Sequence, residues 1–221
     1  MIAEQLNLDL PVLISHARDD FFISESNREA AALIDLWPEW GSHAALVVGP
    51  RASGKSHLLS IWAEKAGARL LKASELSIEL GQTSGNFVFA LDGGDQGCDE
   101  HALLHAYNWT GEQGGSLLIS ALSEPVRWGL ALKDLSSRLL SLPLVRIGAP
   151  DDQLLSAVMA KQFSDRQIEV EEGVSRYLTS RMERTFAAAN ALVAALDQAS
   201  LQHQRRITVP LAREILATMD G

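Results

Sequence analysis

The sequence predicts a three-layer α/β fold, in which a parallel sheet lies between two layers of helices, followed by a smaller helical domain. Three observations lead to this prediction. Short apolar runs alternate with helix-like segments, a glycine-rich loop joins the first of these runs to a helix, and the pattern becomes entirely helical after about residue 150. We place a domain boundary there, at the segment Gly148-Ala-Pro-Asp-Asp.

The N-terminal residues 1–12 are expected to form an extended arm. Leu6, Leu8 and Leu10 alternate with polar residues, which places the three leucines on one side of an extended segment. Pro11 interrupts the pattern after the third leucine. The segment is too short to build a core of its own, so we treat it as separate from the domain that follows.

The α/β domain is expected to span residues 13–150. Its first helix is predicted to begin at Ser26, where a capping residue is followed three places later by Glu29, and to end before Pro38. The strands are short apolar runs, typical of strands that are buried on both faces of a parallel sheet. The five predicted strands are residues 43–48, 69–72, 87–91, 116–120 and 144–147. The three predicted helices between them are residues 55–66, 99–109 and 132–141.

The C-terminal domain, residues 151–221, is expected to be a small helical bundle. Apolar residues recur at helical spacing in three stretches that begin near Leu154, Val174 and Phe186. A fourth helix is predicted after Thr208, because a capping residue there precedes Pro210 in the first turn.

The composition excludes several classes of protein. The chain has 221 residues, of which 47% are hydrophobic and 21% charged, as is ordinary for a folded globular protein. Its net charge of −9 disfavours direct, sequence-specific DNA binding, because such domains usually present a basic surface. The single cysteine, Cys98, excludes an internal disulfide, and no apolar run approaches the roughly 18 residues of a membrane span. We therefore expect a cytoplasmic protein that does not bind membranes.

A complete phosphate-binding loop lies between the first predicted strand of the sheet and a helix. Its residues are Gly49, Pro50, Arg51, Ala52, Ser53, Gly54, Lys55 and Ser56, with His57 next in the first helical turn. The glycines let backbone N–H groups approach phosphate oxygens, the lysine meets the β/γ charge, and the final hydroxyl ligates Mg²⁺. We therefore predict that this loop binds ADP or ATP together with Mg²⁺.

A second predicted strand ends in an acidic residue, Asp92, which is expected to hold Mg²⁺ from the far side. The alternative is that Asp92 is only a loop residue that ends a strand. Enzymes that hydrolyse ATP usually have a second carboxylate directly after it to orient the attacking water, but this chain has Gly93 there. The nearest substitute is Asp95. We therefore expect weak or absent intrinsic ATPase activity.

Three further residues could contact the terminal phosphate. Ser120 ends a predicted strand, where a polar side chain can sense that phosphate. Arg138 and Arg184 could stabilise phosphate charge, as arginines do in NTPases. On spacing alone, however, any serine that ends a strand would look the same, and either arginine could be an ordinary surface residue.

The order of these features resembles an AAA+ ATPase of the DnaA branch. The phosphate-binding loop, the two strands that end in Asp92 and Ser120, the segment that contains Arg138 and a helical lid that carries Arg184 follow one another in that order. The segment Asp20-Phe-Phe-Ile-Ser-Glu-Ser-Asn resembles the entry segment that precedes the loop in DnaA and its homologues. Over nearly all of residues 4–218, the chain most resembles the bacterial Hda family, whose members are homologous to DnaA.

Two features separate the Hda family from DnaA. DnaA continues into a helix-turn-helix DNA-binding domain, whereas this sequence ends at Gly221 after the predicted lid. Hda proteins begin with a peptide that binds the sliding clamp, and Gln5-Leu6-Asn7-Leu8-Asp9-Leu10 is similar to it. Such peptides anchor alternate apolar side chains in pockets of a larger partner. Taken alone, Gln5, Leu6, Leu8 and Leu10 could equally belong to an edge strand.

The resemblance implies negative regulation of chromosome replication initiation. Bound to nucleotide and to the DNA-loaded sliding clamp of DNA polymerase III, such a protein stimulates ATP hydrolysis by DnaA, and it could also associate with itself. Arg138 matches the arginine finger that acts in trans, and the family's ADP site implies Lys55, Ser56 and Arg184 near the phosphates and Phe21 near the adenine. The alternatives are an autonomous AAA+ ATPase, such as a helicase loader, and a nucleotide-sensing adaptor for another partner.

Overall fold

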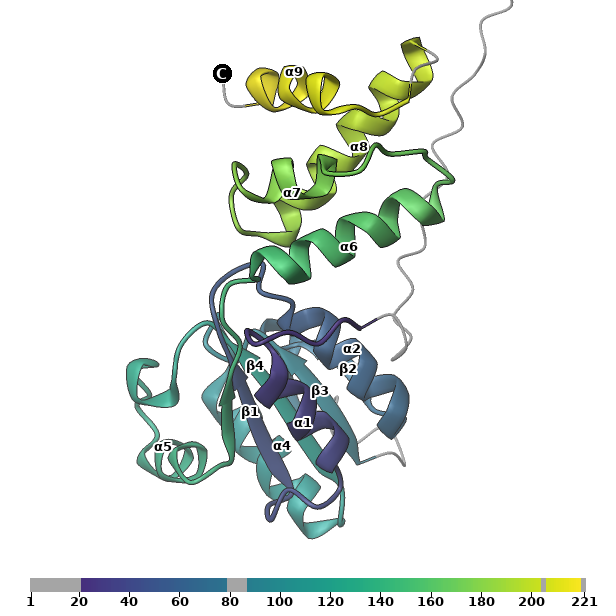
Figure 1. The fold of residues 1–221 in the computed structure, drawn as a ribbon. Helices are drawn as coiled ribbons and strands as arrows, with labels where there is room; N and C mark the ends of the chain where they lie inside the picture. Colours follow the sequence, from purple (N-terminus) through teal and green to yellow (C-terminus); the bar gives the residue numbers. More distant parts are fainter. Residues whose placement is uncertain (1–20, 79–86, 204–205, 220–221) are drawn as a thin grey trace, which may run out of the picture.

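The computed structural model describes residues 21–78, 87–203 and 206–219, and the first part of this chain forms an α/β core (Figure 1). The strands are β1 (Ala44–Val48), β2 (Arg69–Lys72), β3 (Val88–Asp92), β4 (Ser116–Ala121) and β5 (Leu144–Arg146). They are all parallel and lie in the order β2-β3-β4-β1-β5. The prediction of a parallel α/β core followed by a helical domain is confirmed.

The register of the strands brings the predicted site residues to one edge of the sheet. Val47 of β1 lies opposite Ser120 of β4, and Leu91 of β3 lies opposite Ile119 of β4. The carboxyl ends of parallel strands meet at the same edge, and α/β proteins bind ligands in the crevice outside these ends. The loop after β1 and the end of β3 therefore flank the end of β4.

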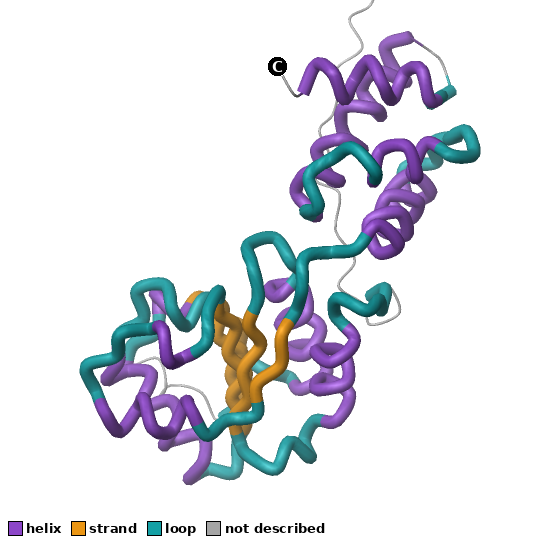
Figure 2. The backbone as a smooth tube through the Cα atoms, turned by 60° about the vertical axis from the view of Figure 1, so that its left-hand side comes forward, coloured by secondary structure: helices purple, strands orange, loops and turns teal. Residues whose placement is uncertain are grey.

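Helices cover both faces of the sheet (Figure 2). They are α1 (Arg28–Leu36) and α2 (Lys55–Ala66) on one face, and α4 (Glu100–Glu112) and α5 (Lys133–Leu140) on the other, with short 3-10 turns η2 (Ala73–Glu75) and η3 (Pro125–Arg127). Side chains alternate between the faces of a strand, so Val47 packs in the cluster with α1 and α2, whereas Leu46 packs in the cluster with α4 and α5. This double burial explains why the strands are continuous apolar runs in the sequence.

The capping box expected at Ser26 does not form. The N-cap of α1 is Asn27, and its side chain makes no capping hydrogen bond. Instead, Asn27 Oδ1 accepts a hydrogen bond from Ser24 N (2.8 Å), and Asn27 Nδ2 donates to Phe22 O (2.9 Å). The Asn27 side chain therefore holds the entry segment through Phe22 and Ser24 and makes no capping hydrogen bond to α1.

The C-terminal part of the chain is a helical lid with an apolar core of its own. Its helices are α6 (Asp152–Asp165), α7 (Val174–Thr179), α8 (Phe186–His203) and α9 (Val209–Met219). Because α6 follows directly after β5, the lid lies beside the edge where the strands end (Figure 1). No helix in the described part of the chain is long and apolar enough to cross a membrane.

Candidate nucleotide-binding site

The loop between β1 and α2 has the tight backbone that a phosphate-binding loop requires. A Cβ atom on Gly49 would collide with the backbone oxygen of Ile147, so only glycine fits there. Gly54, which immediately precedes α2, has a φ of 96°, in the left-handed region that favours glycine, and Ala52 has a φ of 53°. The first N–H groups of α2 have no partner within the helix and can accept an anion at this position.

Lys55 and Ser53 line the inside of this loop. Lys55 is 7% exposed, and its Nζ atom donates hydrogen bonds to Gly49 O (2.9 Å) and Pro50 O (2.6 Å). Ser53 is 4% exposed, and its Oγ atom is buried without a hydrogen-bond partner among the described residues. A buried hydroxyl without a partner carries a desolvation penalty, which a phosphate oxygen would relieve. The loop therefore fits a nucleotide phosphate.

The electrostatic environment of Lys55 also favours an anionic ligand. Burial lowers the pKa of Lys55 because it removes water from the ammonium group, and the nearby charge of Arg51 lowers it further. Asp92 and Asp95 act in the opposite direction, but the net pKa remains below its ordinary value. A phosphate chain would supply additional negative charge and so favour the ammonium form.

Three predicted residues meet at the end of β3. Ser56 Oγ donates to Asp92 Oδ2 (2.7 Å), and Ser120 Oγ donates to Asp92 Oδ1. The Gly93 N–H group in turn donates to Ser120 Oγ (3.1 Å). A serine hydroxyl and a carboxylate are oxygen ligands of the kind that Mg²⁺ takes together with nucleotide phosphates and water.

No group of three or more His, Cys, Asp or Glu side chains within residues 21–78, 87–203 and 206–219 is arranged to hold a metal ion. The Mg²⁺ ligands expected at the end of β3 are Ser56 and Asp92, one hydroxyl and one carboxylate. This agrees with the small number of protein ligands that Mg²⁺ usually has in nucleotide sites.

Gly93, which stands where a second carboxylate would be expected, and Asp95, its nearest substitute, both have structural roles. Gly93 has a φ of 83°, so the backbone there favours glycine. The Asp95 carboxylate accepts hydrogen bonds from Leu122 N (3.0 Å), Ser123 N (2.9 Å) and Ser123 Oγ (3.0 Å). Asp95 therefore holds the turn after β4, and this geometry gives no support to a role in activating water.

The entry segment reaches the start of α2. The rings of Phe21 and His57 are stacked, with centroids 5.8 Å apart and an interplanar angle of 15°. The structure thus brings Phe21 next to the first turn of α2, and its contact with the adenine stays a prediction. It also gives His57 a ring contact that the sequence did not predict.

The segment that joins β5 to the lid, residues 147–151, is bound to the same entry segment. Gly148 N donates to Ser26 O (2.8 Å), and Asp151 caps α6 by accepting a hydrogen bond from Leu154 N (2.8 Å). Burial tends to raise the pKa of Asp151, but hydrogen bonds from Leu154, the Ser24 side chain and the backbone of Ser26 lower it below its ordinary value. The charged form of Asp151 therefore stabilises the start of α6 and its contact with the entry segment.

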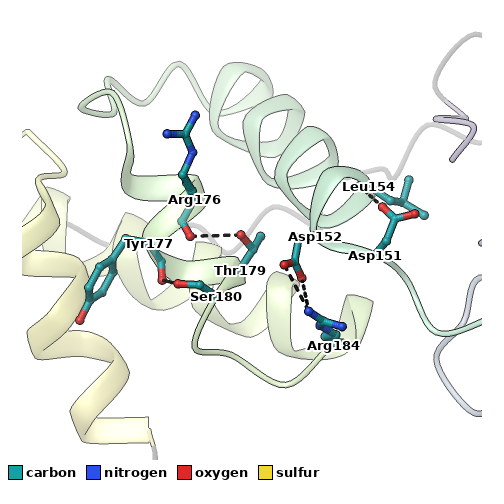
Figure 3. A network of polar contacts seen from close by, with 8 residues as sticks. All are labelled: Asp151, Asp152, Leu154, Arg176, Tyr177, Thr179, Ser180 and Arg184. Atoms are coloured by element: carbon teal, nitrogen blue, oxygen red, sulfur yellow. Dashed lines mark hydrogen bonds and ion pairs between the residues drawn. The ribbon is translucent and has the colours of Figure 1, made fainter. Parts of the chain in front are cut away.

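Arg184 is paired within the lid (Figure 3). Its Nη2 atom lies 3.1 Å from Asp152 Oδ1 and 3.2 Å from Asp152 Oδ2, and its side chain is 62% exposed. The contact of Arg184 with phosphate stays a prediction. Phe186 of the lid lies against the phosphate-binding loop, since a Cβ atom on Gly54 would lie 3.1 Å from Phe186 Cε2. Sequence analysis assigned Phe186 only to a helical pattern and missed this contact.

Arg138 lies in the last turn of α5, at the end of the core opposite the phosphate-binding loop. Its Nε atom pairs with Asp134 Oδ1 at 3.0 Å, and its side chain is 38% exposed. Helix α5 leads to the start of β5, whereas the loop follows the end of β1, and in a parallel sheet these ends are at opposite edges. Arg138 and the phosphate-binding loop of the same chain therefore lie at opposite ends of the strands. Gln5, Leu6, Leu8 and Leu10 lie outside the described residues.

Comparison with known proteins identifies the lid first. Residues 151–216 match the family model described as "Hda, lid domain". The lid is thus similar to that of the Hda family, and the fold of the whole chain is similar to that of DnaA. Domain III of DnaA from Thermotoga maritima is similar to it with a TM-score of 0.76 and 16% identity, over 95% of this chain and 98% of that chain.

Two further solved structures have a similar fold. DnaA from Aquifex aeolicus, bound to AMPPCP, has a TM-score of 0.66 and 17% identity, over 83% of this chain and 65% of that chain. The Thermotoga maritima RuvB branch migration motor has a TM-score of 0.72 and 16% identity, over 92% of this chain and 72% of that chain. At this level of identity these similarities show the AAA+ fold alone.

Proposed function

We propose that this protein is a negative regulator of chromosome replication initiation, which binds nucleotide and, with the DNA-loaded sliding clamp, stimulates ATP hydrolysis by DnaA. The observation that carries this proposal is the separation of two features on one core. A complete phosphate-binding loop lies at one edge of the sheet, and a partly exposed arginine, Arg138, lies at the other. The match of the lid to the Hda family favours DnaA as the partner.

In its own site the protein binds ADP or ATP. Lys55 and the first N–H groups of α2 would hold the phosphates, and Ser56 and Asp92 would hold Mg²⁺, which neutralises phosphate charge. The protein itself hydrolyses ATP weakly or not at all, because Gly93 supplies no carboxylate and Asp95 is engaged by Leu122 and Ser123. Bound nucleotide would then set the conformation of core and lid.

In the partner's site Arg138 acts as an arginine finger. A guanidinium placed against the transferred phosphoryl group stabilises the charge of the transition state, which is worth roughly 10³- to 10⁵-fold in rate where it has been removed from NTPases. Arg138 has one donor engaged by Asp134, and its 38% exposure leaves the side chain accessible to a partner. We propose that the clamp is bound by Gln5, Leu6, Leu8 and Leu10.

The test is a reconstituted assay of phosphate release by ATP-bound DnaA, with clamp loaded on DNA and increasing amounts of this protein. Wild type is expected to accelerate hydrolysis. The Arg138→Ala protein is expected to bind the clamp but not to accelerate hydrolysis. The Gln5→Ala protein is expected no longer to be retained on the clamp. Arg146→Ala is the matched control, because Arg146 is also a surface arginine paired with an acidic residue, Glu124.

The same assay separates this function from an autonomous ATPase. Without DnaA, wild type should release little phosphate in a single turnover, and Lys55→Ala should change that rate little. A substantial rate that is lost in Lys55→Ala, together with no acceleration of DnaA, would show that the protein works through its own hydrolysis cycle. Retention on the clamp without any effect on DnaA would point to an adaptor for another partner.

A further inference from the structure

The surroundings of Arg138 differ from those of Arg146 and Arg184, two other arginines that pair with acidic residues. Besides its pair with Asp134 on the same helix, its guanidinium carbon lies 5.4 Å from the centre of the Tyr107 ring on α4. Its side chain is 38% exposed, whereas those of Arg146 and Arg184 are 65% and 62% exposed. The Arg138 guanidinium thus has two partners, the Asp134 carboxylate on the same helix and the face of the Tyr107 ring on α4.

Tyr107 is itself held by the residue that precedes β1. The rings of His43 and Tyr107 lie 4.4 Å apart at 57°, and His43 Nε2 is 3.0 Å from Tyr107 O. Thr110 Oγ1 donates a hydrogen bond to the same carbonyl oxygen at 3.0 Å. His43, Tyr107 and Arg138 therefore form a layered arrangement that joins β1, α4 and α5.

A glycine inside α4 leaves room for this arrangement. A Cβ atom on Gly111 would lie 3.0 Å from His43 Cε1 and 3.1 Å from His43 Nε2, closer than side-chain contacts normally are. Glycine is unfavourable within a helix, so its presence one residue before the end of α4 needs a packing reason, and the His43 ring provides one.

We propose that Tyr107, supported by His43, is a positioning residue for Arg138. The ring holds the guanidinium by a cation–π contact and limits the rotamers of a long, flexible side chain before a partner arrives. Arg138 then loses less conformational entropy when it binds the partner's phosphates, because the side chain is already ordered. The inference rests on the proposed role of Arg138 in trans.

The test compares Tyr107→Leu, which removes the aromatic face, with Tyr107→Phe, which keeps it. In the DnaA hydrolysis assay, Tyr107→Leu is expected to lower the maximal stimulated rate by about fivefold, in line with the strength of a cation–π contact near the surface. The concentration that gives half-maximal stimulation should change little, and Tyr107→Phe should restore the rate. Tyr177→Leu is the matched control, because it removes a similar contact with Arg181 (4.1 Å) in the lid.

A second readout does not depend on DnaA. The Nε–Hε signal of Arg138, identified by its loss in Arg138→Lys, should show the upfield shift of a group above an aromatic ring. This shift should persist in Tyr107→Phe and disappear in Tyr107→Leu.

The outcomes separate the inference from the proposed function. If wild type does not stimulate DnaA, the proposed function fails whatever the NMR spectrum shows. If wild type stimulates DnaA but Tyr107→Leu matches it, or Tyr107→Phe is as weak as Tyr107→Leu, the positioning role is wrong. An unchanged Arg138 signal in Tyr107→Leu would also overturn it.

Discussion

Replacement of Gly93 by glutamate would place a carboxylate directly after Asp92, as in enzymes that hydrolyse ATP, yet we expect it not to create an ATPase. Gly93 has a φ of 83°, and a Cβ atom built there would lie 2.9 Å from Gln96 Nε2. The new side chain would therefore start toward the turn that contains Gln96. The expectation that activity does not appear rests on this starting direction of the side chain.

The expected loss of stability follows from the same geometry. An L-residue in the left-handed region costs about 1–2 kcal/mol relative to glycine. The clash with Gln96 adds little, because the end of that side chain can move. For a chain of 221 residues this corresponds to a decrease in Tm of roughly 2–8 °C.

The assay is thermal unfolding of Gly93→Glu together with single-turnover ATP hydrolysis in the absence of DnaA. Gly114→Glu is the matched control, because Gly114 has a φ of 66° with open space around it and lies away from the nucleotide loop. Both variants should lose similar stability, and neither should gain activity. A Gly93→Glu protein that is as stable as wild type and hydrolyses ATP at least tenfold faster would refute this reasoning.

Three other predictions concern single residues. ADP at 100 times its Kd should raise the Tm of wild type by about 5–10 °C, as measured by differential scanning calorimetry. Lys55→Ala should abolish this increase, whereas the control variant Lys161→Ala should keep it. Asp151 has a lowered pKa in the folded protein, so its stabilising effect is present above the unfolded-state pKa of about 3.9 and is lost as the pH falls through the lower folded pKa. In urea unfolding at different pH values, the difference in free energy of unfolding between wild type and Asp151→Asn should therefore disappear below about pH 4. Burial raises the pKa of Cys98 to about 11, so iodoacetamide should label the folded protein at neutral pH about 100-fold more slowly than the unfolded chain.

The local features of the core could be predicted from the sequence. The five strands and the helices between them lie within a few residues of their predicted ranges, because an apolar run between turn residues records burial on both faces of a sheet. The phosphate-binding loop could also be predicted, since its glycines and its lysine lie in one continuous segment. The capping box at Ser26 could not, because Asn27 is engaged by Ser24 and Phe22, which belong to a segment that has no helical pattern.

The sequence by itself determined that this chain has the residues of a phosphate-binding loop, a parallel α/β core and a helical C-terminal domain. Only the tertiary structure decided which side chains meet. It engages Asp95 with the turn after β4, sets Phe186 against Gly54 and places Tyr107 beneath Arg138. Periodicity reports which face of an element is buried, but it carries no information about which distant element covers that face. The partners of Asp95, Phe186 and Arg138 lie on other elements, so they emerge only when the sheet and its helices are assembled.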